Sequence, residues 1–163
     1  MQTFLPYPDL IKSLEVLDNK RLGKQRVETY QILSAITGRP KLDGTPYKGW
    51  LNHPCSVMWR KYVPLLKVYY NLSLEEWIKR GFKNTMVRED VNEAIYYPKW
   101  WGETRFHDSH KANLLKKDTE FYSRYKWNVD PSSPYVWMDE NEKWYEQHSG
   151  QKGRVYLHEE VEI

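Results

Sequence analysis

Apolar residues recur at intervals of three and four along much of the chain, and this spacing predicts a mainly helical protein. The helices expected from the pattern span residues 9–18, 20–37, 54–78, 87–95 and 108–117, with one more short turn over 118–125. Asp9 and Asp108 are residues of the type that caps a helix N-terminus, and Gly38 is of the type that ends one. Pro64 should bend or split the third helix, because proline removes a backbone donor and clashes with the preceding turn.

The remaining segments predict loops and a small amount of strand. Residues 38–53 (GRPKLDGTPYKGWLNH) are rich in Gly, Pro and polar groups and indicate a long loop. Residues 144–147 and 154–157 are expected to be short strands on either side of an HSGQKG turn. The fold class expected is therefore mainly α, a compact single-domain helical fold with long loops and a small β-hairpin near the C-terminus.

Composition narrows the class of protein. A chain of 163 residues is long enough for one domain with a real core. It has no apolar run long enough to span a membrane and no signal-peptide core, and its single cysteine, Cys55, excludes an internal disulfide. These features favour a cytoplasmic protein. Motifs for nucleotide phosphates, for the serine of α/β-hydrolases and for zinc proteases are absent from the sequence.

Charge is divided unevenly along the chain. Residues 1–117 hold 20 Lys and Arg against 12 Asp and Glu, whereas residues 118–163 hold 5 against 10. A basic body of this kind could bind a polyanion such as a nucleic acid, although it could also serve only to keep the protein in solution.

The stretch KRLGKQRVE, residues 20–28, carries the first candidate site. On a helix, Arg21, Lys24, Gln25 and Glu28 fall within about 100° of arc. The cations should keep Glu28 ionised, so that it could balance a developing cation or relay a proton. The structural alternative is an ordinary salt bridge between Lys24 and Glu28.

The stretch GWLNHP, residues 49–54, carries the second candidate site. His53 precedes a helix begun by Pro54, where unsatisfied amides also attract phosphates, and Trp50 offers a ring for stacking on a base. Asn52 lies between them as a further candidate nucleic-acid ligand. A histidine that caps the loop and a tryptophan packed in the core explain the same residues.

The third candidate site lies in the stretch FHDSHK, residues 106–111, which is followed by Lys116 and Lys117. His107, His110, Lys111 and Lys117 could form a basic patch that contacts phosphates. Two histidines three residues apart could instead share a metal ion, but the expected cap at Asp108 puts the first outside the helix and no third ligand is near. A solvated helix face is the simplest alternative.

Five stretches together resemble the pyrimidine-dimer DNA glycosylase family, the endonuclease V type of T-even phages, and in particular its distant bacterial and phage branch. They are KRLGKQRVE (20–28), GWLNHPCSVMW (49–59), EEWIKRGF (75–82), FHDSHKANLLKKD (106–118) and PYVW (134–137). The resemblance divides the chain into a glycosylase-like helical domain, residues 1–137, and an acidic C-terminal extension, residues 138–163, packed on it or trailing from it.

The resemblance implies a DNA glycosylase and abasic-site lyase that works on double-stranded DNA as a monomer, without metal or cofactor. Its nucleophile is the N-terminal α-amine, which forms a Schiff base with the sugar. Carried over by motif, the essential glutamate is Glu28, the phosphate binders include Arg21 and Arg26, and His53 matches a histidine at the start of the family's central helix.

The second residue departs from the family's pattern. The family's well-studied enzyme exposes a small residue after its initiator Met is removed, whereas this chain has Gln2, which ordinarily blocks the removal of Met1. The nucleophile would then be the α-amine of Met1 itself. A non-catalytic or repurposed nucleic-acid-binding module on the same fold remains the alternative, and a metal-dependent nuclease using His53, His107 and His110 is a third.

Overall fold

The computed structural model describes residues 1–148 and 153–158. In these residues the α-helices are α1 (Leu10–Glu15), α2 (Asn19–Thr37), α3 (Pro54–Trp59), α4 (Val63–Lys79), α5 (Thr104–Lys117) and α6 (Thr119–Tyr122). Two 3₁₀ turns, η1 (Lys48–Trp50) and η2 (Ser123–Tyr125), and three strands, β1 (Tyr135–Met138), β2 (Trp144–Gln147) and β3 (Val155–Tyr156), complete the order. The expected mainly helical class is confirmed.

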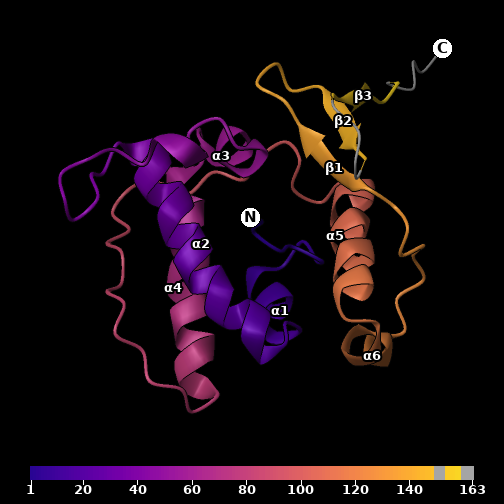
Figure 1. The fold of residues 1–163 in the computed structure, drawn as a ribbon, viewed down its shortest axis with the longest axis horizontal. Coiled ribbons are helices and arrows are strands. Elements are labelled where there is room, and N and C mark those ends of the chain that lie inside the picture. Colours follow the sequence, from indigo (N-terminus) through magenta and orange to yellow (C-terminus); the bar gives the residue numbers. More distant parts are fainter. Residues whose placement is uncertain (149–152, 159–163) are drawn as a thin grey trace.

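The helices enclose one core, which the N-terminal segment enters (Figure 1). Helices α2 and α4 pack side by side, α1 lies against α4, and α5 stands on the other side of the chain terminus. Leu5, Leu22, Leu66 and Leu114 come from four different parts of the chain and are each completely buried. The first residues of the chain are therefore part of the core rather than a free end.

Most helix ends follow the signals in the sequence. Asp9 and Asp18 cap α1 and α2 by accepting hydrogen bonds from backbone N–H groups, and Gly38 ends α2 in the left-handed conformation. The expected helix over 54–78 is split into α3 and α4, with Pro64 in the first turn of α4, where a missing N–H costs nothing.

The helix expected over residues 87–95 is wrong, because this segment has no helical turns and runs extended along α4. Side chains of α4 bind its backbone: Asn71 donates to the carbonyl of Glu89 and accepts from the N–H of the same residue, at 2.9 and 2.8 Å. The hydroxyl of Tyr70 donates to the carbonyl of Val87. These contacts replace the hydrogen bonds that a helix would have made.

The expected start of the fifth helix at Asp108 is also wrong. Helix α5 begins at Thr104, with Glu103 at the N-cap position, so both histidines of FHDSHK lie inside the helix. Their side chains face the interior, since His107 and His110 are only 3% and 0% exposed.

The expected strands over 144–147 and 154–157 are present as β2 and β3, while the turn between them lies mostly outside the described residues. The sequence did not indicate β1, which pairs antiparallel with β2. Trp137, Trp144 and Tyr145 from this sheet are buried in the common core. Across residues 1–148 and 153–158, no helix combines the length and the apolar character needed to cross a membrane.

Candidate active site at the chain terminus

The N-terminal segment is extended, and side chains rather than a neighbouring strand satisfy its backbone. Four successive N–H groups each donate to a side-chain acceptor: Gln2 to Glu28, Thr3 to Gln2, Phe4 to Gln25 and Leu5 to His110. Buried backbone groups must be paired in this way or cost free energy. The segment is therefore fixed residue by residue against α2 and α5.

Gln25 of α2 holds the segment from one side. Its amide donates to the carbonyl of Gln2 at 2.7 Å and accepts from the N–H of Phe4 at 2.9 Å, as a neighbouring strand would. On the surface of an isolated helix this glutamine would be a plain polar residue, but here it is 1% exposed.

Two histidines of α5 hold the segment from the other side. His107 accepts from the N–H of Gly102 through Nε2, so its Nδ1 carries the proton and donates to the carbonyl of Leu5 at 2.7 Å. His110 accepts from the N–H of Leu5 through Nδ1 at 2.8 Å. Burial lowers the pKa of His107 and lowers that of His110 to about 3, so both rings are neutral near pH 7.

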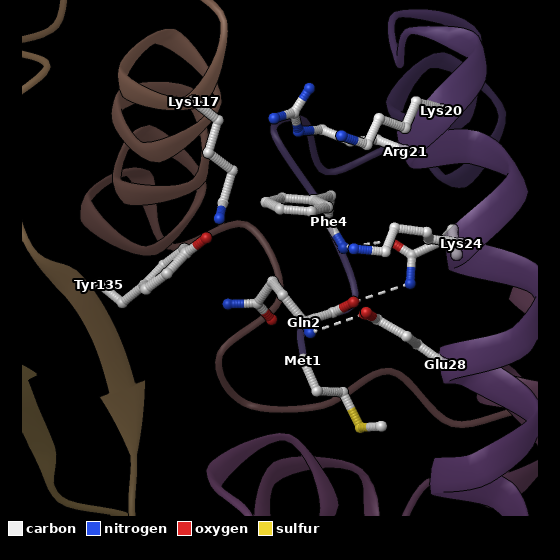
Figure 2. A pocket seen from close by; sticks show the side chains of 10 residues that line it. Met1, Gln2, Phe4, Lys20, Arg21, Lys24, Glu28, Lys117 and Tyr135 are labelled. Atoms are coloured by element: carbon white, nitrogen blue, oxygen red, sulfur yellow. Dashed lines mark hydrogen bonds between the residues drawn. The ribbon is translucent and has the colours of Figure 1, made fainter.

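Glu28 and the chain terminus both line a basic pocket. Its Oε2 accepts the backbone N–H of Gln2 at 3.1 Å, one peptide unit from the α-amine of Met1 (Figure 2). The pocket has a volume of about 180 Å³. Its lining residues are Met1, Gln2, Phe4, Lys20, Arg21, Lys24, Gln25, Glu28, Lys117 and Tyr135.

Four cations surround this pocket, three from the start of α2 and one from the end of α5 (Figure 2). Arg21 is paired with Asp18 at 3.1 Å. Lys20, Lys24 and Lys117 make no ion pair with any residue that the structure describes, and all three are exposed. No salt bridge joins Lys24 to Glu28. The carboxylate of Glu28 instead contacts the backbone of the chain terminus.

His53 lies close to the site as the N-cap of α3, with Nδ1 accepting from the N–H of Cys55 at 3.1 Å. Burial and the positive charge of the chain terminus lower the pKa of His53 to about 4. Burial raises the pKa of Cys55 to about 12, so its thiol stays protonated. Trp50 packs edge-on against His53, and the exposed Asn52 lies beside it in the chain; neither lines the pocket.

Two other candidate residues point elsewhere. Arg26 lies over the ring of Trp77 at 4.2 Å and donates to Asn84, on a different side of α2 from the pocket. Lys111 sits over Tyr7 and pairs with Asp108. The structure therefore brings together Met1, Glu28, Arg21, Lys24, Gln25 and Lys117 of the expected site, with His53 adjacent, and it buries the two histidines of α5 beneath it.

The sequence interpretation missed several pocket residues. Lys20 is the first residue of KRLGKQRVE and lies one turn before Lys24, so helical spacing could have found it. Phe4 and Tyr135 carry no such signal, because they reach the pocket from an extended terminus and from β1. Among residues 1–148 and 153–158, no three His, Cys, Asp or Glu side chains are grouped so that they could hold a metal ion.

The geometry defines a helical protein whose chain terminus and one carboxylate share a basic pocket. A family model described as "Pyrimidine dimer DNA glycosylase" matches residues 1–90, which include all of α2 and α4. The chain belongs to this family. No curated protein and no solved structure gives a significant match. Membership supports a DNA glycosylase of DNA repair, with DNA as substrate.

Proposed function

We propose that the protein is a DNA glycosylase with abasic-site lyase activity, acting on damaged or modified pyrimidines such as pyrimidine dimers in duplex DNA. The α-amine of Met1 is the nucleophile and Glu28 is the working acid–base residue. The observation that carries this proposal is the 3.1 Å hydrogen bond from the N–H of Gln2 to Glu28, which fixes a carboxylate beside the chain terminus.

A chain-terminal amine suits this chemistry, because α-amines are less basic than lysine side chains and a larger fraction is unprotonated near neutral pH. The Met1 nitrogen attacks C1′ of the sugar, and the pyrimidine leaves with the electron pair of the glycosidic bond. The attacking nitrogen loses a proton to the departing pyrimidine, the C1′–O4′ bond opens with O4′ taking up a proton from solvent, and a protonated imine joins Met1 to C1′. Removal of a C2′ proton then expels the 3′ phosphate and breaks the strand.

Glu28 would act at two of these steps. Its negative charge would stabilise the cationic imine, since a fixed opposite charge in a shielded site is worth more than one in water. Its carboxylate would also move protons to and from the sugar. The hydrogen bond from Gln2 holds the carboxylate in place without neutralising it.

The cations of the pocket would bind the DNA backbone. Lys20, Lys24 and Lys117 are exposed and unpaired within the described part of the chain, and they meet at one opening. Phosphate contacts of this kind position DNA and carry little sequence information. Turning the nucleotide out of the stack costs a few kcal/mol, least at a damaged base, which would favour lesions.

The proposed reaction needs neither metal nor cofactor, and one chain supplies every group, so we propose a monomer. All residues that line the pocket lie between Met1 and Tyr135. This supports residues 1–137 as the unit that carries the proposed chemistry.

Borohydride trapping on duplex DNA tests the proposal. Duplexes carrying either an abasic site or a cyclobutane pyrimidine dimer should give a covalent protein–DNA adduct, and Glu28→Gln should lose strand cleavage by orders of magnitude. One extra glycine before Met1 displaces the amine and should abolish trapping, whereas the same glycine after Ile163 should not. Salt-sensitive DNA binding with no adduct on either duplex would favour the non-catalytic binding module instead.

A further inference from the structure

Gln2 carries a buried donor that nothing in the described structure satisfies. The residue is 4% exposed, and its Nε2 has no hydrogen-bond partner. Its Oε1, in contrast, accepts from the N–H of Thr3 at 2.9 Å and from the thiol of Cys55 at 3.1 Å. Because an N–H can donate only to the oxygen, these contacts fix the orientation of the amide and leave its NH₂ group on the other side.

That NH₂ group is directed into the candidate active site. Gln2 lines the pocket, and Figure 2 shows its amide nitrogen on the side toward Tyr135. A buried donor without a partner is destabilising, because it has lost its hydrogen bonds to water and gained none in the protein. A ligand that supplies an acceptor at this point would recover that free energy.

The chemistry of the donor indicates which acceptor it receives. Phosphate oxygens are matched by the lysines of the pocket, whereas the uncharged amide of Gln2 matches an uncharged carbonyl. Gln2 directly follows the residue whose amine would attack C1′. In a pyrimidine nucleotide, the carbonyl carbon C2 is bonded to N1, the atom joined to C1′, so its oxygen O2 lies close to the bond that breaks.

We propose that Nε2 of Gln2 donates a hydrogen bond to the O2 carbonyl of the departing pyrimidine, which makes Gln2 a catalytic residue of base release. The inference rests on the proposed glycosylase function. When the C1′–N1 bond breaks, its electron pair passes to the pyrimidine and is shared between N1 and O2. The donor stabilises this charge until the pyrimidine takes up the proton lost by the attacking nitrogen.

Two variants separate this role from a structural one. Gln2→Met removes both the donor and the acceptor for Thr3 at similar size, whereas Gln2→Glu keeps the acceptor for Thr3 and places an oxygen where the donor was. Both are large enough to retain Met1, which mass spectrometry of the purified proteins verifies. Single-turnover rates are measured on two duplexes, one with a cyclobutane pyrimidine dimer and one with an abasic site, where no base remains to be released.

The expected result is a split between the two reactions. Base release should fall by about 10²-fold in Gln2→Met, the size seen when one donor to a developing anion is lost, while abasic-site cleavage stays within about threefold. Gln2→Glu should show the same split with a larger fall, because its carboxylate repels the charge on the leaving group. Gln31→Met, on α2 and outside the pocket, is the matched control and should leave both rates unchanged.

Other outcomes overturn the inference. An equal fall in both rates would mean that Gln2 only positions the Met1 amine, and no fall in either would mean that its donor is not used. A wild-type protein that is inert on both duplexes would remove the proposed function itself, which distinguishes that failure from the failure of Gln2 alone.

Discussion

The N–H of Leu5 donates to Nδ1 of His110 at 2.8 Å, and both residues are 0% exposed. This hydrogen bond joins positions 105 residues apart in the sequence. It ties the chain terminus to α5, just as Gln25 ties it to α2. The candidate active site is therefore held in place partly by residues outside its lining, namely Leu5 and His110.

Replacing His110 with asparagine should flatten the pH dependence of stability. The pKa of His110 is lowered by burial from 6.5 to about 3, so below pH 6.5 the unfolded state binds a proton that the folded state does not. Stability should fall as pH drops from 6.5 toward 3, by at most about 1.4 kcal/mol per pH unit for this one group. Asparagine keeps an oxygen for the Leu5 N–H but does not titrate.

Urea denaturation of the wild type and His110→Asn between pH 4 and 7 checks this expectation. His158→Asn, at an exposed position, should keep the wild-type slope. An identical slope in the wild type and His110→Asn would contradict a neutral, buried His110.

Gln25→Met should free the chain terminus. The change leaves the carbonyl of Gln2 and the N–H of Phe4 without partners, and each such group costs about 1–3 kcal/mol when buried. We expect a loss of about 2–5 kcal/mol in the free energy of unfolding. We also expect borohydride trapping to fall more than DNA binding does, because the cations remain. Gln31→Met serves as the control, and equal stability of the two variants would count against the role of Gln25.

Lys24 and Arg26 lie two positions apart on α2, but replacing them should have different effects on the salt dependence of DNA binding. Lys24 lines the pocket, so Lys24→Gln should lower the slope of log binding constant against log salt by about 0.9, the value for one phosphate contact. Arg26 is engaged with Trp77, so Arg26→Gln should leave that slope unchanged and reduce stability by about 0.5–2 kcal/mol. Fluorescence anisotropy over a range of salt concentrations measures both slopes, and a lower slope for Arg26→Gln would restore it as a phosphate binder.

Truncation should distinguish β2 from the residues after it. A chain ending at His148 keeps β2, and we expect it to fold with little loss of stability. A chain ending at Trp137 removes Trp144 and Tyr145 from the core, and loss of one large aromatic alone costs about 3–5 kcal/mol. Thermal unfolding of the two chains checks this, and equal midpoints would show that β2 is dispensable.

Local signals in the sequence predicted the helices well where the relevant residues were neighbours. Gly38 and Pro64 act on their own turns, so the end of α2 and the break between α3 and α4 could be read directly, whereas Asp18, expected to be the last residue of the first helix, is instead the N-cap of α2. Residues 87–95 have a helix-like composition, but Asn71 and Tyr70 bind their backbone from α4, and no local pattern reports such contacts.

The candidate site was predicted only in part, because only some of its residues are neighbours on one helix. Helical spacing brought Arg21, Lys24 and Glu28 together, and family resemblance added Met1. The burial of Gln25 and His110 could not be predicted, because their partner is an extended segment with no periodicity of its own.

The residues that bind the N-terminal segment lie later in the sequence, and this order has a consequence for biosynthesis. Outside their own segment, the backbone groups of residues 2–5 find their hydrogen-bond partners at positions 25, 28, 69, 107 and 110. The proposed nucleophile is thus synthesised before its partners, and the segment that carries it can be fixed in place only after His110 has been translated. An unfinished or internally broken chain carries the amine but not the centre that would use it, so only a completed fold would be competent to cut DNA.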